Sequence, residues 1–173
     1  MRALPHHYES SAVVEAVATK LFEHVDEHAG LSSHMNERSW AMGGGQMEIE
    51  TDEQRGRAVG SRISLAGRVF GIRLAVEEMV TERDPPRRKV CETVGRPRLL
   101  VVGHYRMGFE VTPHDRTSVF RVFIDYALPD EAPARWLARL LGPAYARWCT
   151  RRMVDDAVAH FAAMHLGNRL QES

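Results

Sequence analysis

The stretch from about Pro129 to Gly167 constrains the fold most, because no other part of the chain is long enough and apolar enough to form one extended helical unit. Few of its residues are β-branched, which favours a helix over a strand. Apolar side chains recur four apart along it, and this spacing predicts a helix with one buried face. The series is Tyr145, Cys149, Met153, Ala157 and Phe161, with Leu141, Trp148, Val154, Val158 and Met164 at neighbouring positions.

A glycine followed by a proline divides this stretch. Proline is tolerated at the first position of a helix and damaging in its interior, because it lacks an N–H and clashes with the preceding turn. Gly142-Pro143 therefore predicts a joint between a short helix at residues 134–141 and a long helix from Pro143 to about Leu166.

The residues before this helix alternate between apolar and polar side chains, which is the pattern of half-buried antiparallel strands. The alternation is longest in residues 69–82 and 99–111, and at this length it argues against a helix. Asp84-Pro85-Pro86 and Gly95-Arg96-Pro97 separate segments as turns. We predict strands at residues 8–17, 46–51, 58–65, 69–82, 88–94, 99–111 and 117–128.

The alternation also predicts which side chains face inward, since neighbouring residues of a strand point to opposite faces of a sheet. The predicted inner set includes Phe70, Ile72, Leu74, Val76 and Val80 on one strand, Tyr105, Met107 and Phe109 on another, and Phe120, Val122, Ile124, Tyr126 and Leu128 on the last. The opposite parity predicts solvent-facing positions for Arg73, Glu77, His104, Arg106, Arg121, Phe123 and Asp125.

Two small helices are predicted after the first strand. Thr19 is a candidate cap for the first, whose apolar face would hold Leu21, Phe22 and Val25. The second spans about Leu31 to Asn36. The order of elements predicts one α+β domain over residues 1–173, with residues 1–7 as a disordered tail. A curved antiparallel sheet of six to seven strands would wrap around the long C-terminal helix, which covers its inner face.

Composition narrows the partners that this domain would meet. Lys plus Arg and Asp plus Glu both number 23, so the formal net charge of zero provides no long-range attraction for nucleic acid. No stretch approaches the length of a membrane helix, so we expect no stable membrane insertion. Cys91 and Cys149 are far apart and are expected to be buried and reduced. The N-terminal residues lack the pattern of a signal peptide, and a cytoplasmic location is expected.

The residues also resemble a known family. The run TDEQRGRAVGSRISLAGRVFGIRLAVEEMVTERDPPRRKVCETVG, the segment PRLLVVGHYRMGFEV and a strand ending in IDYALP are similar to the START-related helix-grip (SRPBCC) superfamily. Within it, the similarity is to the bacterial polyketide cyclase/dehydrase and lipid-transport branch. Much of the resemblance lies in the spacing of six residues, namely Gly56, Gly60, Gly67, Glu78, Pro85 and Pro86. It implies a helix-grip fold with a cavity between the sheet and the C-terminal helix.

If such a cavity exists, its lining comes from inward sheet residues and the helix. Methionines and aromatic residues with a hydroxyl group are typical of pockets for an apolar ligand with one or two polar groups. The candidate lining residues are Met35, Trp40, Phe70, Ile72, Leu74, Tyr105, Met107, Phe109, Tyr126, Tyr145, Trp148 and Met153.

No metal, cofactor or catalytic residue is predicted. His24 and His28 have helical spacing for paired ligation, but no carboxylate motif accompanies them. His34 would be competent as a general base near neutral pH, and a surface position is the simpler interpretation. The triplet Gly43 to Gly45 lacks the following lysine and helix of a phosphate loop.

Three functions are compatible with this sequence. The leading hypothesis is binding, transport or sequestration of a small hydrophobic molecule or lipid. The second is a polyketide cyclase, aromatase or dehydrase. In such an enzyme, Arg73 would be a candidate for the cation that stabilises a developing enolate. The third is a protein-interaction module whose cavity is filled by side chains. A homodimer is compatible with each of them.

Overall fold

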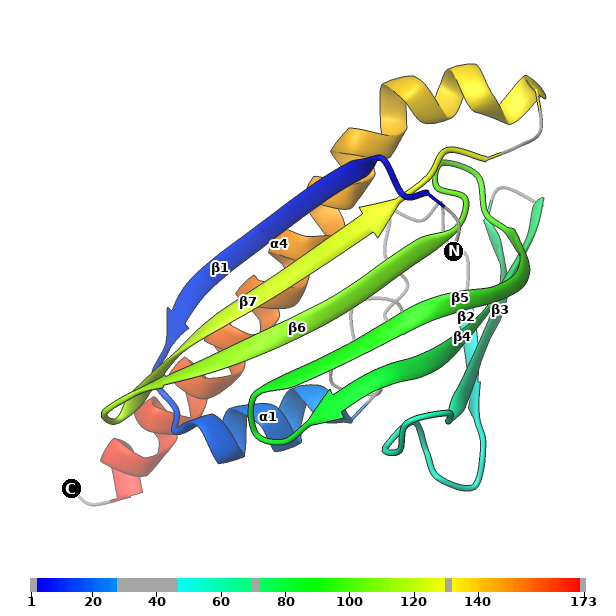
Figure 1. Cartoon of the computed structure of the whole chain (residues 1–173). Helices are drawn as coiled ribbons and strands as arrows, with labels where there is room; N and C mark the ends of the chain where they lie inside the picture. Colours follow the sequence, from blue (N-terminus) through cyan, green and yellow to red (C-terminus); the bar gives the residue numbers. More distant parts are fainter. Residues whose placement is uncertain (1–2, 28–46, 70–71, 130–131, 172–173) are drawn as a thin grey trace.

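The computed structural model describes residues 3–27, 47–69, 72–129 and 132–171. Its elements form a helix-grip fold, as the sequence predicts: a curved seven-stranded antiparallel sheet crossed by one long C-terminal helix (Figure 1). The strands are β1 (His6–Val14), β2 (Met47–Thr51), β3 (Arg62–Val69), β4 (Ile72–Asp84), β5 (Arg88–Arg98), β6 (Tyr105–His114) and β7 (Thr117–Tyr126). The helices are α1 (Ala18–Asp26) and α4 (Ala132–Gln171).

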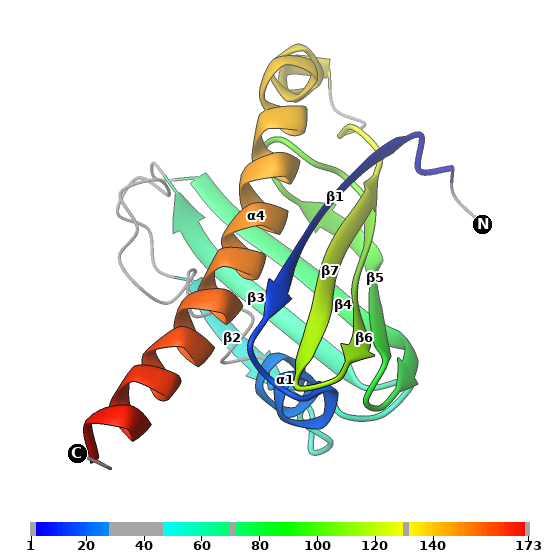
Figure 2. The same ribbon diagram turned by 90° about the vertical axis from the view of Figure 1, so that its left-hand side faces the viewer.

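The sheet is an antiparallel meander to which the first strand is added at the far end. Its order is β1-β7-β6-β5-β4-β3-β2, so β1 pairs with β7, the last strand of the chain. Figure 2 shows α4 crossing one face of the sheet, where it lies mainly against β1 and β7. The expected small helix after β1 is α1, while residues 31–36, the predicted second helix, lie outside the described residues.

Several strand boundaries differ from the predictions for identifiable reasons. β3 begins at Arg62 and not at Ala58, because Gly60 has a φ of +89° in a turn that precedes the strand. β5 continues to Arg98 through the predicted turn, because Gly95, with a φ of +68°, lies at a register shift between β4 and β5. Such a bulge bends a strand without ending it.

The start of β6 and the two ends of the first strand also differ. β6 begins at Tyr105 and not at Leu99, since Gly103 packs against the backbone carbonyl of Leu128, where an added Cβ would lie 2.8 Å from the oxygen. His6 and His7, placed in a tail by the sequence prediction, are the first residues of β1. Val17, not Thr19, precedes α1, and no side chain caps that helix.

The C-terminal helix is continuous from Ala132 to Gln171, with Pro143 inside it. The predicted joint is therefore not a break. Figure 1 shows that the helix bends in this region, so that a lead segment (residues 132–142) points away from the rest of α4. Proline accounts for a bend, because it removes one helical hydrogen bond and crowds the preceding turn.

The predicted inner face of this helix is largely confirmed. Cys149, Met153, Ala157 and Phe161 are buried, whereas Tyr145 is half-buried. Leu141 and Met164 were predicted to flank the buried face and are about half exposed, at 46% and 50%.

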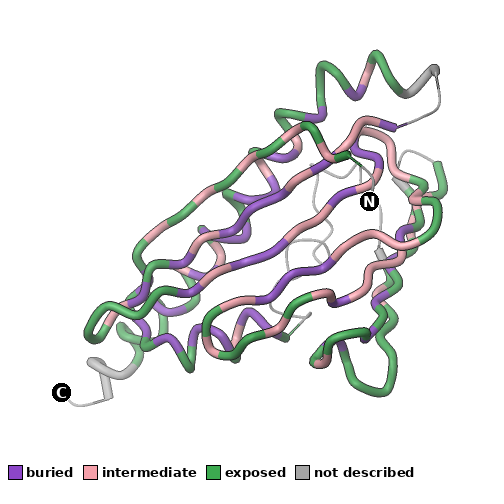
Figure 3. The backbone as a smooth tube through the Cα atoms, viewed as in Figure 1, coloured by how far each residue is buried: buried purple, intermediate pink, exposed green. Residues whose placement is uncertain are grey.

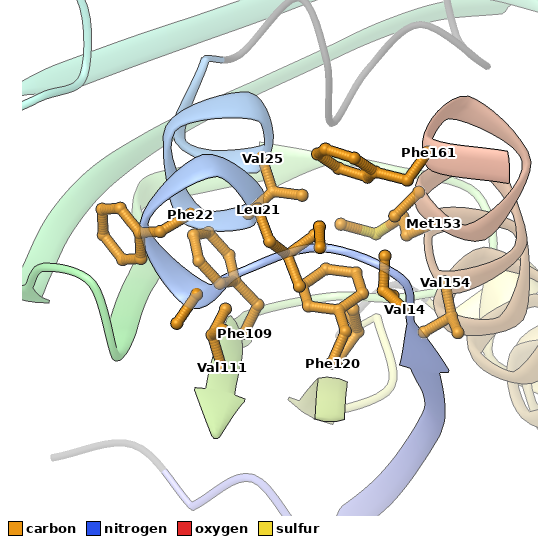
Figure 4. Packing of buried hydrophobic residues seen from close by; sticks show 14 of the residues in the cluster. Val14, Leu21, Phe22, Val25, Phe109, Val111, Phe120, Met153, Val154 and Phe161 are labelled. Carbon is orange, nitrogen blue, oxygen red and sulfur yellow. The ribbon is translucent and has the colours of Figure 1, made fainter. Parts of the chain in front are cut away.

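One end of the molecule is held by a compact apolar cluster between α1, the sheet and α4 (Figure 4). Phe109 lies between Phe22 and Phe120, with ring centroids 5.4 Å and 5.9 Å away. Phe161 and Met153 approach from α4. Aromatic rings of this size supply much of the hydrophobic stabilisation of a core.

On the opposite, convex face of the sheet, three arginine side chains cover Phe123. Phe123 points outward, as predicted, yet only 4% of it is exposed. The guanidinium groups of Arg88, Arg106 and Arg121 lie 5.3, 5.9 and 5.7 Å from its ring centroid. Carboxylates hold these arginines in place, namely Glu9, Glu82, Glu92 and Glu110.

A buried ion pair joins α1 to the sheet. Lys89 on β5 is 2% exposed, and its Nζ lies 2.8 Å from a carboxylate oxygen of Asp26 and 3.1 Å from the Asp26 carbonyl oxygen. Arg83 on β4 donates to the same carboxylate at 2.7 Å. Burial alone would raise the pKa of Asp26, but the hydrogen bonds from Arg83 and Lys89 outweigh it and hold the pKa below its ordinary value.

No helix among the described residues is long and apolar enough to cross a membrane.

We expect Lys89→Met to destabilise the protein by about 3 kcal/mol, because it leaves the buried Asp26 carboxylate without one of its two cations. Urea unfolding at neutral pH measures the loss. The matched control is Arg62→Met, which breaks an exposed pair with Glu77 and is expected to change stability by less than about 1 kcal/mol. Since the pKa of Asp26 is lower in the folded state, its contribution is present above the unfolded pKa and disappears as pH falls through the lowered value. Equal losses in the two variants would contradict this assignment.

Candidate functional site

The middle of the concave face holds a second group of side chains, beside the cluster that packs on α1. A second apolar cluster lies here, and it includes Tyr105 and Tyr126 from the sheet and Ala146 from α4, all buried. Met107 and Tyr145 pack against this cluster and are only half-buried.

One carboxyl group stands among these apolar side chains. Glu78 lies on β4 between Val76 and Val80, whose side chains are buried on the inner face and which share its parity. The hydroxyl of Tyr105, from β6, donates a hydrogen bond to Oε1 of Glu78. Two strands separated by β5 thus bring a carboxyl and a phenol together inside the sheet's curve.

Burial raises the pKa of Glu78 above its ordinary value. The hydrogen bond from Tyr105 and the charge of Lys89 favour the carboxylate and oppose this shift, but they do not cancel it. Burial also raises the pKa of Tyr105 well above normal, and the charge and hydrogen bond of Glu78 add to the effect. A carboxyl that holds its proton more tightly than usual is able to donate a hydrogen bond or a proton.

Three further groups surround this pair. Cys91 on β5 lies opposite Val80 and Met107, while Cys149 and Tyr145 approach from α4. Burial and the charge of Glu78 raise the pKa of both thiols to about 12. These cysteines are free and buried, as predicted, and the raised pKa values make them poor nucleophiles. Burial, followed by the charges of Cys149 and Glu78, likewise raises the pKa of Tyr145.

The candidate lining residues predicted from sequence fall into four groups. Tyr105, Met107, Tyr145 and Tyr126 lie in or against the central cluster around Glu78. Phe109, Met153 and Trp148 belong to, or pack against, the cluster beside α1. Leu74 is half-buried, and Ile72 is 50% exposed. Met35, Trp40 and Phe70 lie outside the described residues, as do His28, His34 and the triplet 43–45.

The side chains predicted to face solvent do lie away from this site. Arg73 is exposed, and Glu77 pairs with Arg62. Arg106 belongs to the arginine cover of Phe123 on the convex face. His104 is half-buried just before β6, with Nδ1 3.2 Å from the Thr93 hydroxyl. The exposed position of Arg73 gives no support to its role as the cation of a cyclase mechanism.

The sequence analysis named Glu78 only among the residues that carry the family resemblance, and it did not predict the contact with Tyr105. The sequence contained a signal for this contact. Glu78 occupies the inner position between Val76 and Val80, on a strand whose other predicted inner residues are Phe70, Ile72 and Leu74. A charged residue at an inner position of an otherwise apolar strand face needs a partner, and a buried hydroxyl is one.

Metal coordination has no support within the described ranges, where no three His, Cys, Asp or Glu residues are grouped to hold an ion. His24, considered above with His28, stacks on His160 of α4 with ring centroids 3.9 Å apart.

A family model described as polyketide cyclase/dehydrase and lipid transport matches residues 5–164. The chain belongs to this family. No curated protein matches it closely enough to suggest a more specific assignment.

Solved structures show the same fold at low identity. The Zhui aromatase/cyclase from Streptomyces sp. R1128 has a TM-score of 0.68 at 15% identity, covering 91% of this chain and 93% of that one. Norcoclaurine synthase from Thalictrum flavum has a TM-score of 0.60 at 15% identity, covering 89% and 84%. At these identities the likeness establishes the helix-grip fold and no activity.

We expect Tyr105→Phe to raise the pKa of Glu78 further. The lost hydrogen bond favours the carboxylate, so its removal leaves burial with less opposition. Carbon-detected NMR titration of labelled glutamate side chains measures this pKa directly, with the exposed Glu48 as internal control. A Glu78 pKa that falls, or that moves together with Glu48, would contradict the proposed contact.

Proposed function

We propose that this protein binds a small, largely apolar molecule with one hydrogen-bonding group, such as a carbonyl or hydroxyl, in a cavity between its sheet and α4. The observation that carries the proposal is the Glu78–Tyr105 pair on the apolar inner face. A polar pair in such a place can orient a ligand, because a carboxyl donates a hydrogen bond when protonated and accepts one when ionised, and a phenol accepts or donates.

The surrounding side chains fit an apolar ligand. Met107, Tyr145 and Trp148 are half-buried and pack against the two apolar clusters. Methionine and aromatic residues adapt to varied apolar shapes without leaving polar atoms unsatisfied. The family description, which includes lipid transport, agrees with a ligand of this class.

A panel of apolar molecules with and without a carbonyl group tests the proposal. We expect carbonyl-bearing members to raise the melting temperature, and Glu78→Gln to weaken their binding by about tenfold, the effect of losing about one good hydrogen bond. Binding of the matched hydrocarbons should change little, because they do not use the carboxyl. Glu48→Gln, an exposed change of the same chemistry on β2, is the control.

The binding proposal fails if no panel member raises the melting temperature and no small molecule co-purifies in native mass spectrometry. That result would favour the interaction-module hypothesis, in which side chains fill the inner space.

A cyclase-type enzyme is the second candidate, and the raised pKa of Glu78 is the observation in its favour. An acid that keeps its proton near the substrate can protonate a ketone oxygen as an enol forms, or a hydroxyl as water leaves. One structural neighbour is an aromatase/cyclase, and family members are described as polyketide cyclases or dehydrases. Glu78 would be the proton donor and Tyr105 the group that positions it.

We expect the enzyme hypothesis, if correct, to give turnover of a synthetic poly-β-ketone thioester that Glu78→Gln lowers by about 100-fold while substrate affinity changes far less. Chromatography of the products measures the rate, and turnover should fall as pH rises through the pKa of Glu78. Turnover that is unaffected by Glu78→Gln, or absent alongside tight binding, would leave binding as the function.

A further inference from the structure

The lead segment of α4 exposes large apolar side chains that nothing else described in the fold covers. Trp136 is 63% exposed and Leu140 is 68% exposed. The two are four residues apart and therefore neighbours on one side of the helix. Figure 3 shows this segment projecting beyond the end of the sheet, with most of its residues exposed. An exposed tryptophan beside an exposed leucine is unfavourable in water and points to a contact surface.

The same part of the helix is strongly cationic. The whole chain balances 23 basic with 23 acidic residues, but residues 132–154 contain no Asp or Glu. They do contain five arginines, Arg135, Arg139, Arg147, Arg151 and Arg152. Of these, Arg152 pairs with Asp156 and Arg147 lies 5.5 Å from the ring centroid of Tyr8. Arg135 and Arg139 are exposed and form no salt bridge within the described part of the chain. These two arginines carry the positive charge on which the proposal below rests.

Apolar and cationic side chains lie next to each other in the lead segment. Trp136 and Leu140 are one turn apart on one helical stripe. Arg135 and Arg139 precede Trp136 and Leu140 by one residue and flank that stripe. The lead segment thus presents an apolar ridge edged by guanidinium groups.

We propose that this ridge docks the protein on the surface of an anionic lipid membrane. The partner must offer an apolar layer into which the side chains of Trp136 and Leu140 insert. It must also present negative charge at the edge of that layer, where Arg135 and Arg139 lie. The boundary between headgroups and acyl chains offers both at once, since tryptophan settles at this depth and arginines extend to the phosphates.

The position of these residues also fits a membrane surface. The apolar pair and the exposed Arg135 and Arg139 lie together on a segment that projects beyond the end of the sheet. Such docking is peripheral, in agreement with the lack of a membrane-spanning helix in the described residues. It goes beyond ligand binding and does not require the Glu78–Tyr105 pair.

Vesicle flotation of the full chain tests the proposal. We expect the protein to float with vesicles of phosphatidylcholine mixed with phosphatidylglycerol, and to remain behind with phosphatidylcholine alone. Raising the salt concentration should release it, because salt screens contacts between exposed arginines and lipid phosphates.

Two pairs of variants separate the apolar and cationic contributions. Trp136→Ser with Leu140→Ser should weaken binding to anionic vesicles about tenfold or more. Its control is Met164→Ser with Leu166→Ser, which removes exposed apolar side chains from the other end of the same helix. Arg135→Gln with Arg139→Gln should weaken binding at least about tenfold, whereas Arg68→Gln with Arg116→Gln, exposed elsewhere, should not.

Circular dichroism melts of all four variants establish that each one folds, so that lost binding reports on the surface. The proposal is overturned if anionic and neutral vesicles bind equally, or if control and ridge variants behave alike. It is also overturned if the wild type floats with neither vesicle but forms a dimer in light scattering that Trp136→Ser with Leu140→Ser abolishes. The ridge would then contact a second copy of the chain.

Discussion

The buried contact between Lys89 and Asp26 is the constraint on which the rest of the molecule depends. It fixes the end of α1 against β4 and β5, and α1 in turn closes the apolar cluster that holds β6, β7 and α4 together. The same lysine acts on the candidate site, since its charge opposes the rise in the pKa of Glu78. Stability and site electrostatics therefore share one buried cation, and a change at Lys89 would alter both.

The two faces of the sheet differ in how their side chains are packed and paired. On the convex side, arginines lie over Phe123 and are tied to glutamates, and Gly108 is packed so closely that an added Cβ would lie 2.7 Å from the Lys89 carbonyl oxygen. On the concave side, the Glu78 carboxyl accepts a hydrogen bond from Tyr105, and the half-buried Met107 and Tyr145 pack against the same cluster as Tyr105. Ligand chemistry is accordingly expected on the concave side.

Much of this architecture could be predicted from sequence, because strand alternation and helical spacing record which faces are buried. Cys149, Met153, Ala157 and Phe161 were predicted as a buried helix face from spacing alone, and they are buried. The prediction from local residue types was wrong where tertiary contacts determine the backbone conformation. Gly95 and Pro97 read as a turn, yet they lie within β5, because a bulge against β4 accommodates them.

The candidate site was harder to predict than the fold. Parity placed Tyr105 and Met107 inward, but no local pattern pairs Tyr105 with Glu78, which is 27 residues away. The parity of β4 also fails after Val80, where a register shift turns Arg83 inward toward Asp26. A single inserted residue of this kind reverses every later position on a strand, and periodicity alone does not reveal it.

The pairing of β1 with β7 has a consequence for how the chain acquires its structure. Tyr8 lies opposite Ile124, so the first strand has no partner until more than a hundred further residues exist. α4, which packs on β1 and β7, comes later still. Contacts this distant in sequence slow folding and leave an unpaired strand in the growing chain. A ribosome-bound chain would therefore keep β1 exposed until its last strand emerged, and chaperones would meet it in that state.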